Sequence, residues 1–211
     1  MVDIAFLICY IILVTNERRL NMFLGDVLEV RSGLVVSRKK AKDENSAKYK
    51  YKQLNLRSVS KEGYIIEDEL EVLSTDEIIS SDYMTVVGDV VVRLTDPYTA
   101  IYIDDAYAGL VVSSNFAIIK ESKDYNSKFL AFYLNGDTAK KKLYSNMQGS
   151  IIKSINLAAI EQLELPLIPK STQEVYGNLF SAIVDKLQTI EKIRELEIKL
   201  QKQLVEQVSK M

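Results

Sequence analysis

The chain has 211 residues, 47% of them hydrophobic, and a formal net charge of −2. Cys9 is its only cysteine and histidine is absent, which excludes an intramolecular disulfide, a thiolate metal cluster and catalysis by Ser–His or Cys–His pairs. The length suits one domain with an appendage, and phosphate-loop and dinucleotide motifs are missing. We therefore expect a non-enzymatic protein without a cofactor, suited to the reducing cytoplasm.

The small net charge hides a polarised distribution. Nine basic and two acidic residues lie in Arg38–Lys61, which gives this segment a charge of +7. Twelve acidic residues and one arginine give Glu62–Asp105 a charge of −11, and Lys120–Lys153 is positive again at +4. Two basic segments around an acidic one can place a positive face on an acidic protein. The overall charge therefore does not exclude nucleic acid as a partner.

Residues 1–21 are interpreted as an apolar N-terminal extension. Within it, Ile4–Val14 is an apolar run of eleven residues, whereas a membrane-spanning helix needs about 20. Asp3 precedes the run without any positive charge, unlike the start of a secretory signal peptide. A buried strand or helix, a start-site artefact with Met22 as the working first residue, and a membrane or export role are the alternatives.

The elements that follow predict an α+β fold. Leu24–Arg31 is typical of an amphipathic turn that enters a strand, and the lysine-rich Ser37–Lys52 of an exposed loop. Helical spacing covers Ser127–Tyr144, and Asn156 can cap a short helix through Leu163. Six short β-type runs bounded by turn residues lie between these segments: Gly63–Ile66, Thr85–Val87, Val90–Val92, Ala100–Ile103, Gly109–Val112 and Phe116–Ile119. We expect a globular domain with a mostly antiparallel sheet.

The last segment, residues 171–211, predicts one long helix. It contains no proline, and Ser171 with Glu174 matches a capping box at its start. One stripe of apolar residues follows the segment: Val175, Leu179, Ile183, Leu187, Ile190, Ile193, Leu196, Leu200, Leu204 and Val208. From Leu179 to Val208 the stripe takes eight steps over 29 residues, a period of about 3.6 that is typical of a straight helix. Because a head of this size cannot cover such a stripe, we expect it to pair between two chains as a homodimer.

The first basic segment alternates cations with aromatic residues, a pattern suited to phosphate contacts and to stacking or groove insertion. The candidate DNA contacts are Arg38, Lys39, Lys40, Lys48, Tyr49, Lys50, Tyr51 and Lys52. Arg57 is a further candidate because arginine makes the commonest specific base contact, although it could instead neutralise nearby acidic residues. The alternative for the whole segment is a solvated charged loop.

A polar turn supplies a second group of candidates. Gln148 can pair bidentately with adenine, Ser150 can contact either base edge, and Lys153 can reach guanine or a phosphate. The alternative is that Gly149 serves a tight turn and its polar neighbours are incidental.

Several short motifs occur in order along most of the chain: Leu24–Val27, Gly88–Val92, Ser113–Ile119, Phe129–Leu134, Leu165–Pro169 and Gln173. In this order and spacing the sequence resembles the specificity (S) subunits of type I restriction–modification systems, with half of their usual content. The resemblance implies one DNA target-recognition domain in place of two, and one long helix in place of two that pair. It also implies double-stranded DNA and methyltransferase (modification) subunits as partners, with the restriction subunit reached indirectly through them.

We therefore expect a DNA target-recognition domain over residues 22–170 and a pairing helix over residues 171–211. The expected function is to read a bipartite DNA site as a dimer and to position the methyltransferase subunits. Two rival functions are a non-DNA coiled-coil interaction protein that uses the same helix and a membrane-associated module held by residues 1–21. The absence of salt-sensitive binding to duplex DNA would favour the first rival. Fractionation with membranes that is lost when the chain starts at Met22 would favour the second.

Overall fold

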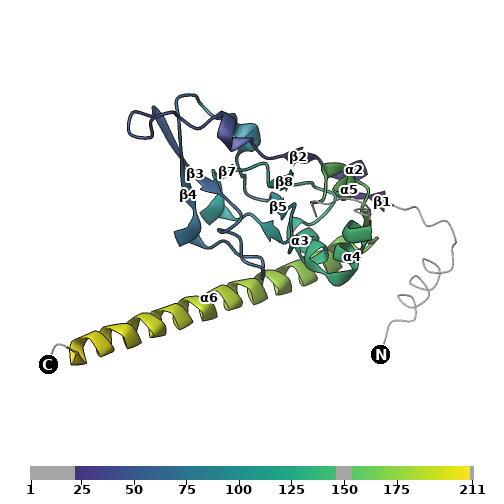
Figure 1. The fold of residues 1–211 in the computed structure, drawn as a ribbon. Coiled ribbons are helices and arrows are strands. Elements are labelled where there is room, and N and C mark those ends of the chain that lie inside the picture. The colour runs from purple at the N-terminus through teal and green to yellow at the C-terminus, as the bar shows by residue number, and fades with distance from the viewer. Residues whose placement is uncertain (1–21, 146–153, 210–211) are drawn as a thin grey trace, which may run out of the picture.

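The computed structural model of the protein describes residues 22–145 and 154–209. The strands are β1 (Met22–Phe23), β2 (Val30–Ser32), β3 (Tyr49–Leu54), β4 (Glu71–Thr75), β5 (Val90–Arg93), β6 (Ala100–Tyr102), β7 (Val111–Val112), β8 (Phe116–Ile119) and β9 (Glu164–Leu165). The α-helices are α2 (Leu24–Val27), α3 (Ser127–Asn135), α4 (Asp137–Ser145), α5 (Leu157–Glu161) and α6 (Lys170–Val208). Short 3-10 helices cover Val36–Arg38, Glu67–Glu69, Ser81–Tyr83 and Asp105–Tyr107. The expected α+β head with a long C-terminal helix is confirmed (Figure 1).

A four-stranded antiparallel sheet in the order β2-β8-β5-β6 forms the centre of the head. Its inner strands are buried on both faces, and successive side chains alternate between the faces. Val90 and Val92 belong to the core cluster that Phe129 of α3 joins, whereas Val91 and Ile118 belong to the core cluster on the other face. Two-sided burial is why these strands appear in the sequence as continuous apolar runs.

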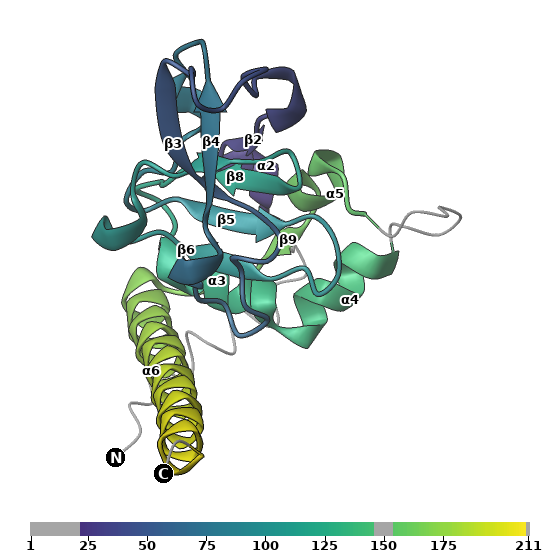
Figure 2. The same ribbon diagram turned by 60° about the vertical axis from the view of Figure 1, so that its left-hand side comes forward.

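A second sheet, in the order β4-β3-β7, extends the head on the side away from α6 (Figure 2). β3 pairs antiparallel with β4 and parallel with β7. The predicted exposed loop Ser37–Lys52 is therefore wrong at its end, because β3 begins at Tyr49. The predicted strands Gly63–Ile66 and Thr85–Val87 are also wrong: Gly63 turns the chain with a φ of 98°, and the amide of Asp89 closes a turn onto the carbonyl of Val86.

The C-terminal part of the head returns to its N-terminal part. β1 and β9 pair antiparallel, with Met22 opposite Leu165. The predicted cap of α5 is confirmed, because the Asn156 side chain accepts a hydrogen bond from the amide of Ala159 at 2.8 Å. After β9 the chain enters α6, which packs against α3.

Helix α6 has 39 residues and is therefore about 58 Å long at 1.5 Å per residue. It passes along the head next to α3 and then continues beyond the head as a free rod (Figure 1). The predicted capping box is wrong, because the helix begins at Lys170 after Pro169 and no side chain caps it. The side chain of Gln173 instead anchors this end of the helix: it accepts a hydrogen bond from the amide of Asn126 and donates one to the carbonyl of Ile168, each at 2.9 Å, which ties the first turn into the head.

Candidate nucleic-acid interface

Strand β3 separates the predicted cations from the predicted aromatic residues. Because successive side chains of a strand point to opposite faces, Lys50 and Lys52 share one face, and Tyr49 and Tyr51 share the other. Tyr51 is half-buried against the core cluster beneath the hairpin, and its hydroxyl accepts a hydrogen bond from the amide of Ile79 at 3.4 Å. Lys50 and Lys52 are exposed. The arrangement suits a phosphate-contacting face of lysines, with Tyr51 holding the hairpin to the core.

Two of the other predicted cations have carboxylate partners. Lys39 forms an ion pair with Glu77, and Lys40 pairs with Glu44 at 2.7 Å. The hydrogen bond to Glu44 raises the pKa of Lys40 above its ordinary value. Within residues 22–145 and 154–209, the other four cations that were predicted between Arg38 and Lys52 form no ion pair; they are Arg38, Lys48, Lys50 and Lys52. These four cations can contact a polyanion without first breaking one of the ion pairs of the described residues.

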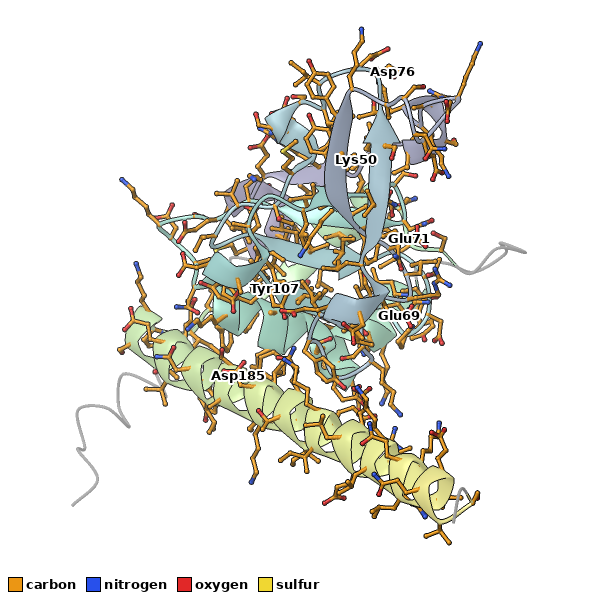
Figure 3. All side chains as sticks on the ribbon, turned by 90° about the vertical axis from the view of Figure 1, so that its left-hand side faces the viewer. Lys50, Glu69, Glu71, Asp76, Tyr107 and Asp185 are labelled. Atoms are coloured by element: carbon orange, nitrogen blue, oxygen red, sulfur yellow. The ribbon has the colours of Figure 1, made fainter. Side chains whose placement is uncertain are left out.

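Arg57 lies in a more acidic part of the head. Its guanidinium contacts Glu71 at 2.7 Å and Glu69 at 3.7 Å. Figure 3 shows Lys50 high on the hairpin, with Glu71 and Glu69 lower, toward α6. This geometry fits the alternative that Arg57 neutralises local acidic residues, and the sequence could not show it because both carboxylates follow Arg57 by more than ten positions.

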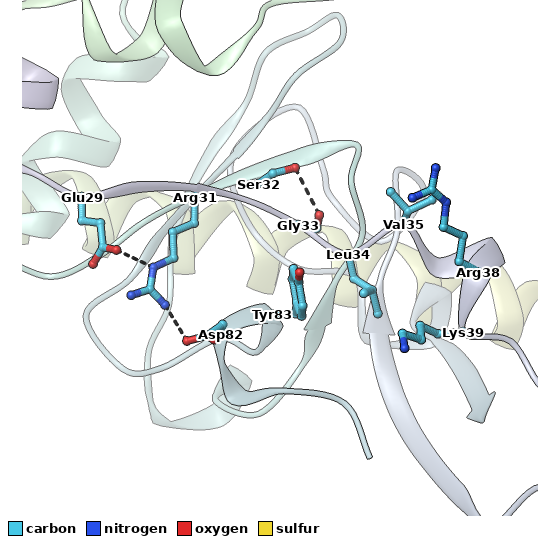
Figure 4. A pocket seen from close by; sticks show the side chains of 10 residues that line it. All are labelled: Glu29, Arg31, Ser32, Gly33, Leu34, Val35, Arg38, Lys39, Asp82 and Tyr83. Carbon is cyan, nitrogen blue, oxygen red and sulfur yellow. Dashed lines mark hydrogen bonds and ion pairs between the residues drawn. The ribbon is translucent and has the colours of Figure 1, made fainter. Parts of the chain in front are cut away.

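A cleft of about 690 Å³ opens beside the basic segment, between β2 and the 3-10 helix Ser81–Tyr83 (Figure 4). Its lining includes two predicted residues, Arg38 and Lys39, and one that the sequence analysis missed, Arg31. Arg31 donates to Glu29 at 2.6 Å and to Asp82 at 2.7 Å, and the hydrogen bond to Glu29 raises its pKa. The cleft is therefore lined by the ion-paired guanidinium of Arg31 and by two further cations, Arg38 and Lys39. The sequence could have indicated Arg31 as a candidate only through its position shortly before the basic segment Arg38–Lys61.

The predicted base-reading residues Gln148, Ser150 and Lys153 lie outside the described residues. On their N-terminal side, Tyr144 of α4 donates a hydrogen bond to Asp96 at 2.9 Å. Burial, together with this bond, raises the pKa of Tyr144 to about 12.

The predicted pairing residues of α6 lie on its solvent-facing side. The exposed fraction of these side chains ranges from 39% to 71%; they are Leu179, Ile183, Leu187, Ile190, Ile193, Leu196, Leu200, Leu204 and Val208. The head instead contacts the other side of the helix, where Gly177 is buried and Gln188 donates to the carbonyl of Ile65 at 3.1 Å. A Cβ at Gly177 would come within 2.8 Å of the Phe129 amide, so glycine permits this close approach. The apolar stripe is left uncovered, as the sequence analysis expected.

Within the described ranges, no cluster of three or more histidine, cysteine or acidic residues has the arrangement of a metal site. The same part of the chain contains no helix of sufficient length and apolar character to span a bilayer. The apolar run Ile4–Val14 lies outside the described residues.

Comparison with protein families identifies the class to which this fold and this charged head belong. Residues 19–200 match the family model described as the type I restriction modification DNA specificity domain. Because this match covers most of the chain, the protein belongs to that family. No curated protein matches the sequence.

Two solved structures share the fold. The first comes from a study of complex assembly and conformational transition of the type I R-M system; it has a TM-score of 0.61 and 15% identity, covering 82% of this chain and 44% of that one. The second is the HsdS subunit from Thermoanaerobacter tengcongensis, with a TM-score of 0.56, 17% identity and the same coverages of 82% and 44%. At these identities the likeness is one of fold. The chain spans less than half of the length of either structure.

Proposed function

We propose that the head binds one short half-site of double-stranded DNA and that α6 pairs two heads, so that the dimer reads a bipartite site. Membership of the type I DNA specificity family carries this proposal. Lys48, Lys50 and Lys52 form no ion pair with a described residue, and they supply a surface for DNA phosphates. The stripe of α6 supplies a surface for the second chain. The domain limits at residues 22–170 and 171–211 belong to the same proposal.

The proposed partners are the methyltransferase subunits and, through them, the restriction subunit. Support comes from the fold shared with a structure of type I complex assembly. In this arrangement the specificity chain supplies position and sequence preference, and the chemistry belongs to the partner subunits. Gln148, Ser150 and Lys153 remain the proposed base contacts, since side-chain amide, hydroxyl and amino groups can each hydrogen-bond to base edges.

Salt dependence of DNA binding tests the proposed contact face. Replacing Lys50 and Lys52 with Ala should weaken binding to all duplex sequences alike, because phosphate contacts carry no sequence information. The slope of log K against log salt should fall by about 0.9 for each lost phosphate contact. The measurement is fluorescence anisotropy with labelled duplexes over a salt series.

The matched control replaces Lys199 and Lys202, which are exposed on the part of α6 that projects beyond the head. This control removes the same charge and should leave the slope unchanged. An unchanged slope for the Lys50 and Lys52 variant would show that DNA contacts a different face. Salt-insensitive or absent DNA binding by the wild-type chain would instead overturn the proposed function.

A further inference from the structure

The apolar stripe of α6 is symmetric about its own midpoint. The steps between its ten residues read 4, 4, 4, 3, 3, 3, 4, 4 and 4, and this series is the same in both directions. The midpoint lies between Glu191 and Lys192. The residues at equal distances from it are Val175 and Val208, Leu179 and Leu204, Ile183 and Leu200, Leu187 and Leu196, and Ile190 and Ile193.

This symmetry has a direct consequence for pairing. In an antiparallel dimer with a twofold axis, each residue faces the partner residue at the mirrored position. If the axis passes between Glu191 and Lys192, every apolar residue of the stripe faces an apolar residue of the second copy. A shift of the register by one residue would set apolar side chains against polar ones. The stripe therefore complements a second copy of itself at one register.

Two charged residues interrupt the stripe, and they obey the same symmetry. Lys186 lies between Ile183 and Ile190 on this face, and Glu197 lies at the mirrored place between Ile193 and Leu200. Both side chains are exposed, and neither forms an ion pair with any residue in the described part of the chain. By contrast, Arg194 is paired with Glu191 on its own helix. Lys186 and Glu197 thus lack partners at the positions where a second copy would supply them.

We propose that two copies of α6 pair antiparallel with their twofold axis between Glu191 and Lys192, and that Lys186 of each copy forms an ion pair with Glu197 of the other. The inference rests on the proposed function and specifies its dimer. A charged pair within an apolar seam fixes register and orientation, because any other alignment leaves a charge against apolar side chains. A parallel dimer would oppose Lys186 to Lys186 and Glu197 to Glu197, which is repulsive.

Charge reversal in the full-length chain tests this register. Lys186→Glu alone and Glu197→Lys alone should each weaken self-association by about tenfold or more, since two symmetry-related ion pairs become repulsive. The double variant K186E/E197K should restore wild-type association. A mixture of the two single variants should form heterodimers in preference to homodimers, because all four charges then match. Sedimentation equilibrium measures the first three effects, and native mass spectrometry of the mixture the fourth.

A matched control is Lys199→Glu, which places the same reversal on another face of α6 and should leave association unchanged. Unweakened K186E homodimers, together with preferential heterodimers between K186E and the wild type, would indicate a parallel dimer and overturn the proposal, because residue 186 would then face residue 186 of the other copy. Unchanged association of both single variants, with the wild type still dimeric, would place the register elsewhere while leaving the proposed function standing. A wild-type chain that stays monomeric would refute pairing through α6 itself.

Discussion

The centre of the proposed seam offers a quantitative prediction. Replacing both Ile190 and Ile193 with Ala removes four side chains from the dimer, two from each copy. The exposed fractions of Ile190 and Ile193 in the single chain are 50% and 52%. Their own helix therefore covers about half of each side chain, and the second copy can bury at most the other half.

The expected loss follows from this exposure. Each Ile→Ala change removes three carbon groups, at about 0.8 kcal/mol per buried group, or about 2.4 kcal/mol for full burial. Half of that amount at four positions comes to about 5 kcal/mol. Since 1.4 kcal/mol corresponds to a factor of ten, the dissociation constant of the dimer should rise roughly 3,000-fold.

Sedimentation equilibrium over a range of protein concentrations measures this constant. A useful control is Ile198→Ala, which makes the same truncation at a residue of 38% exposed fraction outside the stripe and should have little effect. Duplexes with one half-site should bind the double variant as they bind the wild type, whereas bipartite duplexes should lose affinity. A change in the dissociation constant smaller than about tenfold would refute the placement of these residues in the seam.

Two further predictions concern the head and its junction with α6. Asp89→Ala should lower the free energy of unfolding by about 3 kcal/mol, because the buried Asp89 carboxylate accepts hydrogen bonds from Lys120 at 2.7 Å and from the amide of Val86 at 2.9 Å. Urea denaturation measures this, and a loss below about 1 kcal/mol would contradict the assigned role of this pair. Gly177→Leu should push α6 away from α3 and widen the range of spacer lengths tolerated between half-sites, whereas Asn178→Ala on the exposed face should not. Selection of bound duplexes from a randomised library measures the spacer, and an unchanged range would show that this junction does not set it.

Local pattern alone was sufficient to predict the long helix and its uncovered stripe. The spacing from Leu179 to Val208 specifies one face of a helix, and the apolar side chains on that face are 39% to 71% exposed. The inner strands β5 and β8 were equally predictable, since burial on both faces requires continuous apolar runs. The Asn156 cap depends on residues three positions apart and was predicted for the same reason.

Contacts between distant segments decided the rest. The lysine-rich Ser37–Lys52 predicts a loop, but from Tyr49 onward the chain is a strand because β4 and β7 supply its partners. The sequence also could not show which of the predicted cations form ion pairs. The carboxylates that pair with Lys39 and Arg57 come from other segments of the chain. The anchoring of the first turn of α6 was hidden too, because Gln173 bonds to Asn126, which lies 47 positions away in the sequence. Secondary structure followed from neighbours in sequence, whereas the charge available to DNA followed from neighbours in space.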